Sequence, residues 1–123
     1  MSEAAPDYAA EIRRQISENP IILYMKGSPV QPQCGFSMRA VQVLGECGHR
    51  YAYVDILSHP QIRSTLPSVS DWPTFPQLFI AGELIGGSDI IAEMHTAGEL
   101  EPLLASAVAE AGAESPGDGG DGG

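Results

Sequence analysis

The chain has 123 residues, of which 43% are hydrophobic and 7% aromatic, which is the composition expected of one soluble globular domain. Its formal net charge at pH 7 is -10, with six Lys and Arg residues against sixteen acids. Nucleic-acid binding needs a basic face, so we expect no nucleic-acid partner. The longest apolar run, Ile21 to Met25, is far below the roughly 20 residues of a membrane-spanning helix, so we expect no membrane partner either.

The two ends of the chain differ in composition from its middle. Met1 to Pro6 has neither the basic region nor the apolar core of a signal peptide, so we expect a cytoplasmic protein. Beyond Ala109 the residues are mostly Gly, Ser, Pro and acids, with almost nothing to bury. We therefore predict a folded domain over residues 1–112 and a disordered, acidic, Gly-rich tail over residues 113–123.

The first half of the chain predicts a βαβ unit preceded by a helix. Three apolar residues at every fourth position predict that first helix, between Asp7 as a cap and a stop at Asn19 and Pro20: Tyr8, Ile12 and Ile16. Ile21 to Met25 predicts a buried strand, followed by a loop from Lys26 to Gln33. A helix then opens at Cys34 and ends at Gly48, and we expect it to turn four side chains inward: Phe36, Ala40, Val41 and Leu44. A second strand, Tyr51 to Asp55, should pair in parallel with the first.

The second half predicts a hairpin between helices. Ser58 and Gln61 are spaced as a capping box for a short helix that reaches Leu66 and ends before Pro67. Gln77 to Ile80 and Glu83 to Ile85 flank Ala81-Gly82 as a hairpin. A helix follows near Ile90 to His95, and four residues mark a last one: Leu100, Leu103, Leu104 and Val108. The whole pattern predicts an α/β, thioredoxin-like fold with a central mixed four-stranded sheet flanked by helices.

Cys34 is the main candidate for chemistry. A thiol at a helix N-terminus faces free backbone N–H groups and the positive end of the helix dipole, which favour the thiolate. Ser37 stands where a Cys-x-x-Cys motif has its second sulfur, so Cys34 has no resolving partner in its own turn. Cys47 is thirteen positions further along one helix, about 20 Å away at ~1.5 Å per residue, too far for a disulfide or a shared cluster.

Four motifs follow one another along the chain: Lys26-Gly27-Ser28, Cys34-Gly35-Phe36-Ser37, Trp72-Pro73-Thr74-Phe75-Pro76-Gln77 and Gly86-Gly87-Ser88-Asp89. With these motifs the chain resembles the monothiol glutaredoxins of the Cys-Gly-Phe-Ser class in their bacterial single-domain form. The resemblance runs from about Tyr8 to Val108. It implies that glutathione lies beside the cysteine, that a homodimer with two glutathiones holds a [2Fe-2S] cluster, and that the protein works with BolA-like proteins and with apo iron–sulfur recipients.

The resemblance also assigns residues. Cys34 would be both the catalytic thiol and the protein's metal ligand. Lys26 would contact glutathione, and Arg63 would hold its glycine carboxylate with a planar fork. Phe75 would precede a cis-proline and pair with the peptide like a strand edge. Ser88 and Asp89, at the start of a helix, would take the γ-glutamyl carboxylate and ammonium.

Three functions remain open at this point. The first is a glutathione-dependent [2Fe-2S] carrier in cluster biogenesis and transfer. The second is an oxidoreductase that reduces glutathione mixed disulfides with Cys34 alone, because a second glutathione can resolve the intermediate. The third is a regulatory module that acts through a BolA-like partner.

Overall fold

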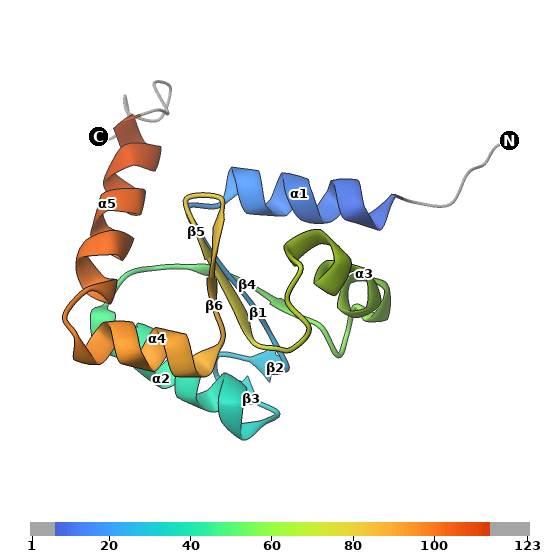
Figure 1. Ribbon diagram of the computed structural model, residues 1–123, viewed down its shortest axis with the longest axis horizontal. Coiled ribbons are helices and arrows are strands. Elements are labelled where there is room, and N and C mark those ends of the chain that lie inside the picture. The colour runs from blue at the N-terminus through green and yellow to red at the C-terminus, as the bar shows by residue number, and fades with distance from the viewer. Residues whose placement is uncertain (1–6, 114–123) are drawn as a thin grey trace, which may run out of the picture.

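A computed structural model describes residues 7–113, which form a mixed four-stranded sheet with helices on both faces (Figure 1). The elements are α1 (Tyr8–Glu18), β1 (Ile21–Met25), β2 (Gly27–Ser28), β3 (Gln31–Pro32), α2 (Gly35–Cys47), β4 (Ala52–Asp55), α3 (Pro60–Ser70), β5 (Gln77–Ile80), β6 (Glu83–Gly86), α4 (Ser88–Thr96) and α5 (Leu100–Ala113). The predicted fold class is confirmed, and the short β2–β3 hairpin within the predicted loop is an addition. Apart from Ala113, the predicted tail of residues 113–123 lies outside the described residues.

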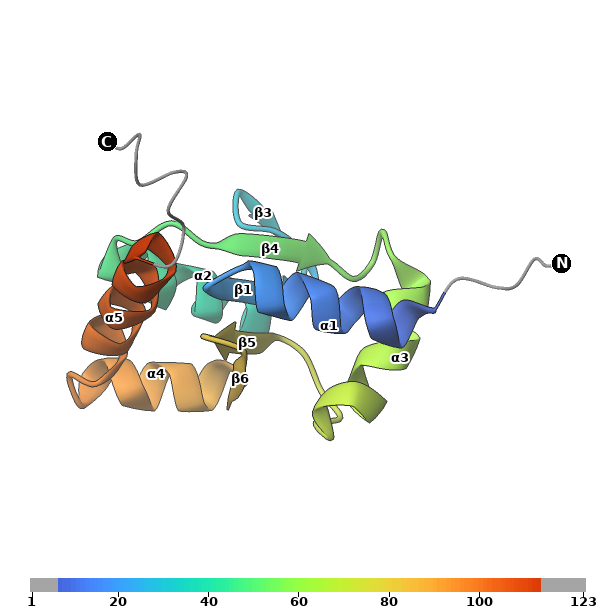
Figure 2. The same ribbon diagram turned by 90° about the horizontal axis from the view of Figure 1, so that it is seen from above.

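The sheet has the strand order β4-β1-β5-β6 (Figure 2). β1 pairs with β4 in parallel, as predicted, and with β5 in antiparallel orientation. β5 and β6 form the predicted hairpin. β1 is therefore a central strand, and all five of its residues are buried because both faces of the sheet are covered.

Alternation along β1 divides the interior into two clusters. Ile21, Leu23 and Met25 point to the face covered by α2, α4 and α5. Ile22 and Tyr24 point to the other face, where buried residues of α1 and α3 pack: Ile12, Ile16, Ile62 and Leu66. Figure 1 shows these two groups of helices on opposite sides of the sheet. The carboxyl end of β1 leads directly from this rigid interior to Lys26.

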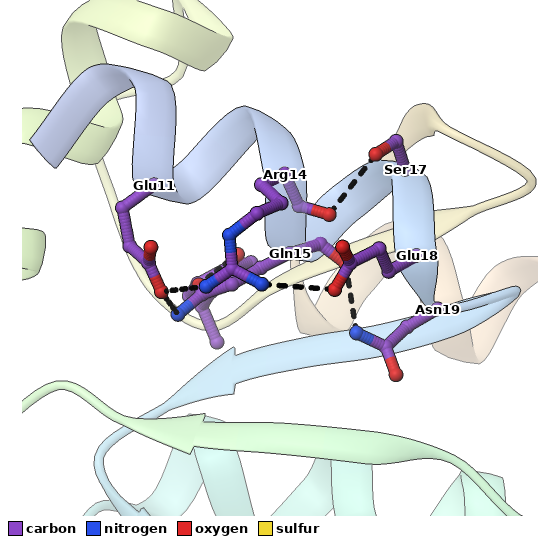
Figure 3. A network of polar contacts seen from close by, with 7 residues as sticks. Glu11, Arg14, Gln15, Ser17, Glu18 and Asn19 are labelled. Carbon is purple, nitrogen blue, oxygen red and sulfur yellow. Dashed lines mark hydrogen bonds and ion pairs between the residues drawn. The ribbon is translucent and has the colours of Figure 1, made fainter.

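Helix α1 begins at the predicted cap and has a charged outer face. Oδ1 of Asp7 accepts a hydrogen bond from the backbone N–H of Ala10 at 3.0 Å. On the exposed side, the Arg14 guanidinium pairs with both Glu11 and Glu18 (Figure 3). This cluster belongs to the solvated surface of α1.

The prediction for α3 was wrong at both ends. His59, not Ser58, is the N-cap residue, and it makes no side-chain capping bond. The Ser58 hydroxyl donates instead to Oδ2 of Asp55, at 3.1 Å. The helix also continues through Pro67 to Ser70. The Pro67 carbonyl accepts backbone N–H groups at the helix end, including that of Trp72 at 3.3 Å, so the proline lies within a completed last turn.

The inward face of α2 also differs from the prediction at one position. Phe36 is 63% exposed, whereas Ser37 is fully buried together with Ala40 and Leu44. Val41 is half-buried against the core. Cys34 caps the helix, and the Ser37 hydroxyl accepts the backbone N–H of Lys26 at the end of β1, so Ser37 takes the buried position and Phe36 stays at the surface.

Candidate functional site

A cavity of about 780 Å³ lies where β1, α2, α3 and α4 approach one another. Its lining is made by Lys26, Phe36, Arg63, Pro67, Trp72, Pro73, Thr74, Phe75, Pro76, Gly87, Ser88, Asp89 and Ile90. Cys34 is not part of this lining, but Lys26, which precedes it in the chain, and Phe36, which follows it, both are. Because the Lys26 charge and the Phe36 backbone N–H both act on the Cys34 sulfur, the cavity lies beside the thiol.

Cys34 is the N-cap residue of α2. Its backbone is extended, and its Sγ accepts a hydrogen bond from the backbone N–H of Ser37 at 3.3 Å. In most helices an oxygen of Ser, Thr, Asp or Asn occupies this position. Here a half-buried sulfur receives the free N–H groups and the positive end of the helix dipole. This geometry stabilises a negative charge on Sγ.

The Ser37 side chain connects the thiol to the end of β1. Its Oγ accepts a hydrogen bond from the backbone N–H of Lys26 at 3.0 Å and lies 3.4 Å from Sγ of Cys34. The neutral Cys34 thiol donates to this oxygen, and the Ser37 hydroxyl hydrogen can donate in turn when the sulfur is a thiolate. Ser37 therefore fixes the position of the Lys26 backbone relative to the Cys34 sulfur.

The same residues set the acidity of Cys34. Burial alone would raise the pKa of the Cys34 thiol, but hydrogen bonds from the Ser37 hydroxyl and from the backbone N–H groups of Ser37 and Phe36, together with the Lys26 charge, bring it below its ordinary value. Cys47 is in the opposite situation. Burial, then the charges of Glu101 and Glu46, raise the pKa of the Cys47 thiol. Of the two cysteines, only Cys34 therefore has a thiol that favours the thiolate, the reactive form of cysteine.

The loop after β1 is held by Asp55. Oδ1 of Asp55 accepts from the backbone N–H groups of Gly27 and Leu57, each at 2.9 Å. Gly27 has a φ of +91°, and a Cβ there would lie 2.5 Å from the carbonyl oxygen of Gln31. Only glycine fits at this first position of the β2–β3 hairpin. This clamp fixes the direction in which Lys26 leaves the sheet.

The loop from Trp72 to Pro76 forms another wall of the cavity. The peptide bond between Phe75 and Pro76 is cis, as the resemblance implied. The fully buried Gln77 supports the loop from below, because its Nε2 donates to the carbonyl oxygens of Trp72 at 2.9 Å and Thr74 at 3.1 Å. The half-buried Phe75 faces the cavity from this supported loop.

The N-terminus of α4 faces the cavity without a side-chain cap. Its N-cap residue is Gly87, which supplies no acceptor for the first N–H groups of the helix. A Cβ at Gly87 would lie 3.3 Å from the Pro76 carbonyl oxygen, so glycine permits the close approach of helix and loop. Asp89 lies in this first turn and forms an ion pair with Arg39 of α2, at 3.1 Å.

The structure thus brings together the side chains that the sequence singled out. Five of them line the one cavity: Lys26, Arg63, Phe75, Ser88 and Asp89. Three contributors were not predicted in their roles, namely Ser37, Gln77 and the partner of Asp89, Arg39. Ser37 was considered only for the sulfur it lacks. The sequence signal for Gln77 was its place directly after Phe75-Pro76, where a polar residue begins a strand that is otherwise apolar.

The chain is similar to several known proteins. The sequence profile of the glutaredoxin family matches residues 21–85. Over 106 residues the chain is 58% identical to Glutaredoxin 4 of Escherichia coli K12, covering 86% of this chain and 92% of that protein. It is 68% identical over 88 residues to the probable monothiol glutaredoxin GrlA of Legionella pneumophila, covering 72% of this chain and 99% of that protein. The crystal structure of a buckwheat glutaredoxin–glutathione complex superposes with a TM-score of 0.72 at 25% identity, covering 81% and 89% of the two chains.

Proposed function

Because the chain belongs to the glutaredoxin family, and within it to the monothiol glutaredoxins, we propose that it carries a [2Fe-2S] cluster for iron–sulfur cluster biogenesis and transfer. Two protomers would each supply Cys34, and two glutathione molecules would supply the other thiols. The cargo would pass to apo iron–sulfur proteins, and a BolA-like protein would be a further partner. We place this activity in the cytoplasm, where both cysteines would remain unpaired, as they are in the structure.

The observation that carries the proposal is the single activated thiol. A [2Fe-2S] cluster takes four ligands, usually thiolates. Cys47 lies at the opposite end of α2 from Cys34. Among residues 7–113, no group of three or more His, Cys, Asp or Glu side chains is arranged to hold a metal ion. One protomer would therefore contribute one ligand, and the remaining thiols must come from a second protomer and from small molecules.

The charges of the cavity fit glutathione as the source of those thiols. Glutathione carries two carboxylates and one ammonium at neutral pH. The cavity lining has two cations, Lys26 and Arg63, and one anion, Asp89. In the described part of this acidic chain, neither Lys26 nor Arg63 forms an ion pair, so both can receive a carboxylate. The uncapped start of α4 adds backbone N–H groups for the second carboxylate. The buckwheat glutaredoxin was solved as a glutathione complex, which supports the same ligand here.

A second function rests on the lowered pKa of Cys34. A thiolate that ligates iron also attacks a glutathione mixed disulfide. Cys34 Sγ would bond to the glutathione sulfur and release the substrate thiolate. The thiolate of a second glutathione would then attack the glutathione sulfur of this mixed disulfide, which forms glutathione disulfide and releases the Cys34 thiolate. The two functions use the same sulfur and cavity, and they differ in whether two protomers come together. A regulatory module working through a BolA-like partner is compatible with either.

Anaerobic reconstitution with iron, sulfide and glutathione tests the carrier function. Cys34→Ser should abolish the visible absorbance and the bound iron, since a hydroxyl is a poor substitute for a soft thiolate. Cys47→Ser is the matched control and should bind the cluster like the wild type. Native mass measurement should show two protomers per cluster. Iron retained by Cys34→Ser would rule out this ligand, and rapid turnover of a glutathionylated substrate by a wild type that binds no iron would favour the oxidoreductase.

A further inference from the structure

Arg39 makes a contact at this site that the proposed ligand does not explain. It lies on α2, the helix capped by Cys34, and it is not part of the cavity lining. Its Nη1 donates to Oδ1 of Asp89 at 3.1 Å, which joins the cysteine helix to the first turn of α4. The two side chains are 52% and 80% exposed, so the pair stands at the rim of the cavity in water.

The pair leaves Asp89 able to bind a second cation. A carboxylate has two oxygens with about four lone-pair sites, and Arg39 uses one oxygen. Asp89 is also one of the residues that line the cavity, so a ligand inside it lies close to a carboxylate of which Arg39 uses Oδ1 alone. An ammonium group from the cavity side can therefore bind Asp89 while Arg39 remains in place.

We infer that Arg39 is a positioning residue that, through Asp89, makes the site selective for thiols carrying a γ-glutamyl group. This inference rests on the proposed glutathione site and extends it. The γ-glutamyl end has a carboxylate and an ammonium on one carbon. The carboxylate would bind the uncapped N–H groups of α4, and the ammonium would bind Asp89 as Arg39 holds it. A thiol peptide without this end, such as cysteinylglycine, would gain nothing from Arg39.

Arg39 acts as a support here and not as a competing ligand. An exposed ion pair is worth only about 0–1 kcal/mol, too little to exclude a ligand that brings several hydrogen bonds of its own. By contrast, a side chain that is 80% exposed samples several rotamers when unpaired, and ordering it on binding lowers the affinity. The guanidinium orders Asp89 in advance and also holds α4 against the helix that presents Cys34.

The test compares two non-reactive probes bound to the apo protein, S-methylglutathione and S-methylcysteinylglycine, followed by NMR titration. Arg39→Gln should raise the Kd of S-methylglutathione about two- to fivefold, the range expected for one exposed ion pair, and leave the Kd of S-methylcysteinylglycine unchanged. Arg39→Lys, which keeps the charge, should recover part of the loss. Arg14→Gln is the matched control, because Arg14 pairs with Glu11 and Glu18 on α1 and is not part of the cavity lining.

A double-mutant cycle separates positioning from general attraction of an anionic ligand. If Arg39 acts through Asp89, Arg39→Gln should change the S-methylglutathione Kd little in an Asp89→Asn background. A full effect of Arg39→Gln in that background, or equal losses for both probes, would overturn the inference. An Arg39→Gln variant with the same S-methylglutathione Kd as the wild type would also overturn the inference, and the proposed glutathione site would then stand. A wild type that binds neither probe would overturn the glutathione site as well.

Discussion

Replacing Ser37 by Ala is the sharpest test of how this fold activates its thiol. The change removes one oxygen from a fully buried position and leaves the helix backbone intact. It deletes an oxygen that accepts from the Lys26 N–H at 3.0 Å and from the Cys34 thiol at 3.4 Å, and with it the hydroxyl that donates to the sulfur once Cys34 is a thiolate. The backbone N–H groups of Ser37 and Phe36 still face the sulfur. Ser37→Ala should therefore weaken the thiolate without abolishing it.

The size of the effect follows from hydrogen-bond energies. A hydrogen bond to a charged group contributes about 1.5–3 kcal/mol, and sulfur is a weak acceptor, so the lower end applies. Because about 1.4 kcal/mol is a factor of ten, the thiolate population of Cys34 near pH 7 should fall about tenfold. The Lys26 N–H loses its acceptor in a partly buried place, which should cost about 1–3 kcal/mol of folding stability.

Alkylation by iodoacetamide between pH 5 and 10 measures the first effect, with Cys47→Ser as the background so that one thiol reports. The profile of Ser37→Ala should shift to higher pH, and its rate near pH 7 should fall. Ser17→Ala is the matched control, because the Ser17 hydroxyl donates to the Arg14 carbonyl on exposed α1, far along the chain from the thiol. An unshifted profile with a normal folded protein would refute the role of the Ser37 hydroxyl and leave the helix N–H groups as the main cause.

Four further changes test other parts of the site and fold. Ser37→Cys places a second thiol one helical turn from Cys34, within reach of a disulfide bond. The variant should have a higher glutathione-linked reductase turnover, and its reconstituted cluster should be lost faster in air. An unchanged turnover would contradict this. Gln77→Leu leaves the Trp72 and Thr74 carbonyls without their donor and should lower the free energy of unfolding, measured in urea, by about 1–3 kcal/mol. An unchanged urea midpoint would show that the loop from Trp72 to Pro76 does not need these hydrogen bonds. Burial alone would raise the pKa of the Asp55 carboxyl, but hydrogen bonds from Gly27, Leu57 and Ser58 bring it below its ordinary value. The stability that the ionised carboxylate contributes is therefore present above the unfolded-state pKa of about 4 and is lost as the pH falls. In thermal melts, the Tm of Asp55→Asn should fall less than that of the wild type between neutral pH and about pH 3. Deleting residues 114–123 should leave the Tm within about a degree, because that sequence has no apolar face to bury, and a larger drop would show that the tail docks.

The elements that could be predicted from sequence are those whose local residue pattern alone indicates how deeply the element is buried or where it begins. Ile21 to Met25 is apolar at every position, which fits only an element covered on both faces, and β1 is the buried strand between β4 and β5. Cys34 follows a loop rich in Pro and Gly and starts an amphipathic run, which predicts a helix N-terminus. In such segments the local pattern and the tertiary environment favour the same structure.

The elements that could not be predicted depend on partners distant in the chain. A spacing of four residues from Phe36 through Ala40 to Leu44 predicts an inward Phe36. The structure instead buries Ser37, because its hydroxyl meets the Lys26 N–H eleven residues earlier. A buried serine breaks the hydrophobic pattern, and only the position of β1 makes that burial favourable. Arg39 and Asp89 are fifty residues apart, so their pairing required the packing of α2 against α4.

Ser37 also explains why one sulfur serves this site. A cysteine at position 37 would retain a weak donor to Cys34, but it would add a nucleophile that could close a disulfide and remove the thiolate. The serine hydroxyl keeps the donor, binds the Lys26 N–H and cannot be oxidised to a disulfide. Cys34 is therefore activated and has no sulfur partner within reach in its own chain. Lys26 both lines the cavity proposed for glutathione and helps to lower the pKa of the Cys34 thiol, so in this proposal one side chain serves recognition of the ligand and activation of the cysteine.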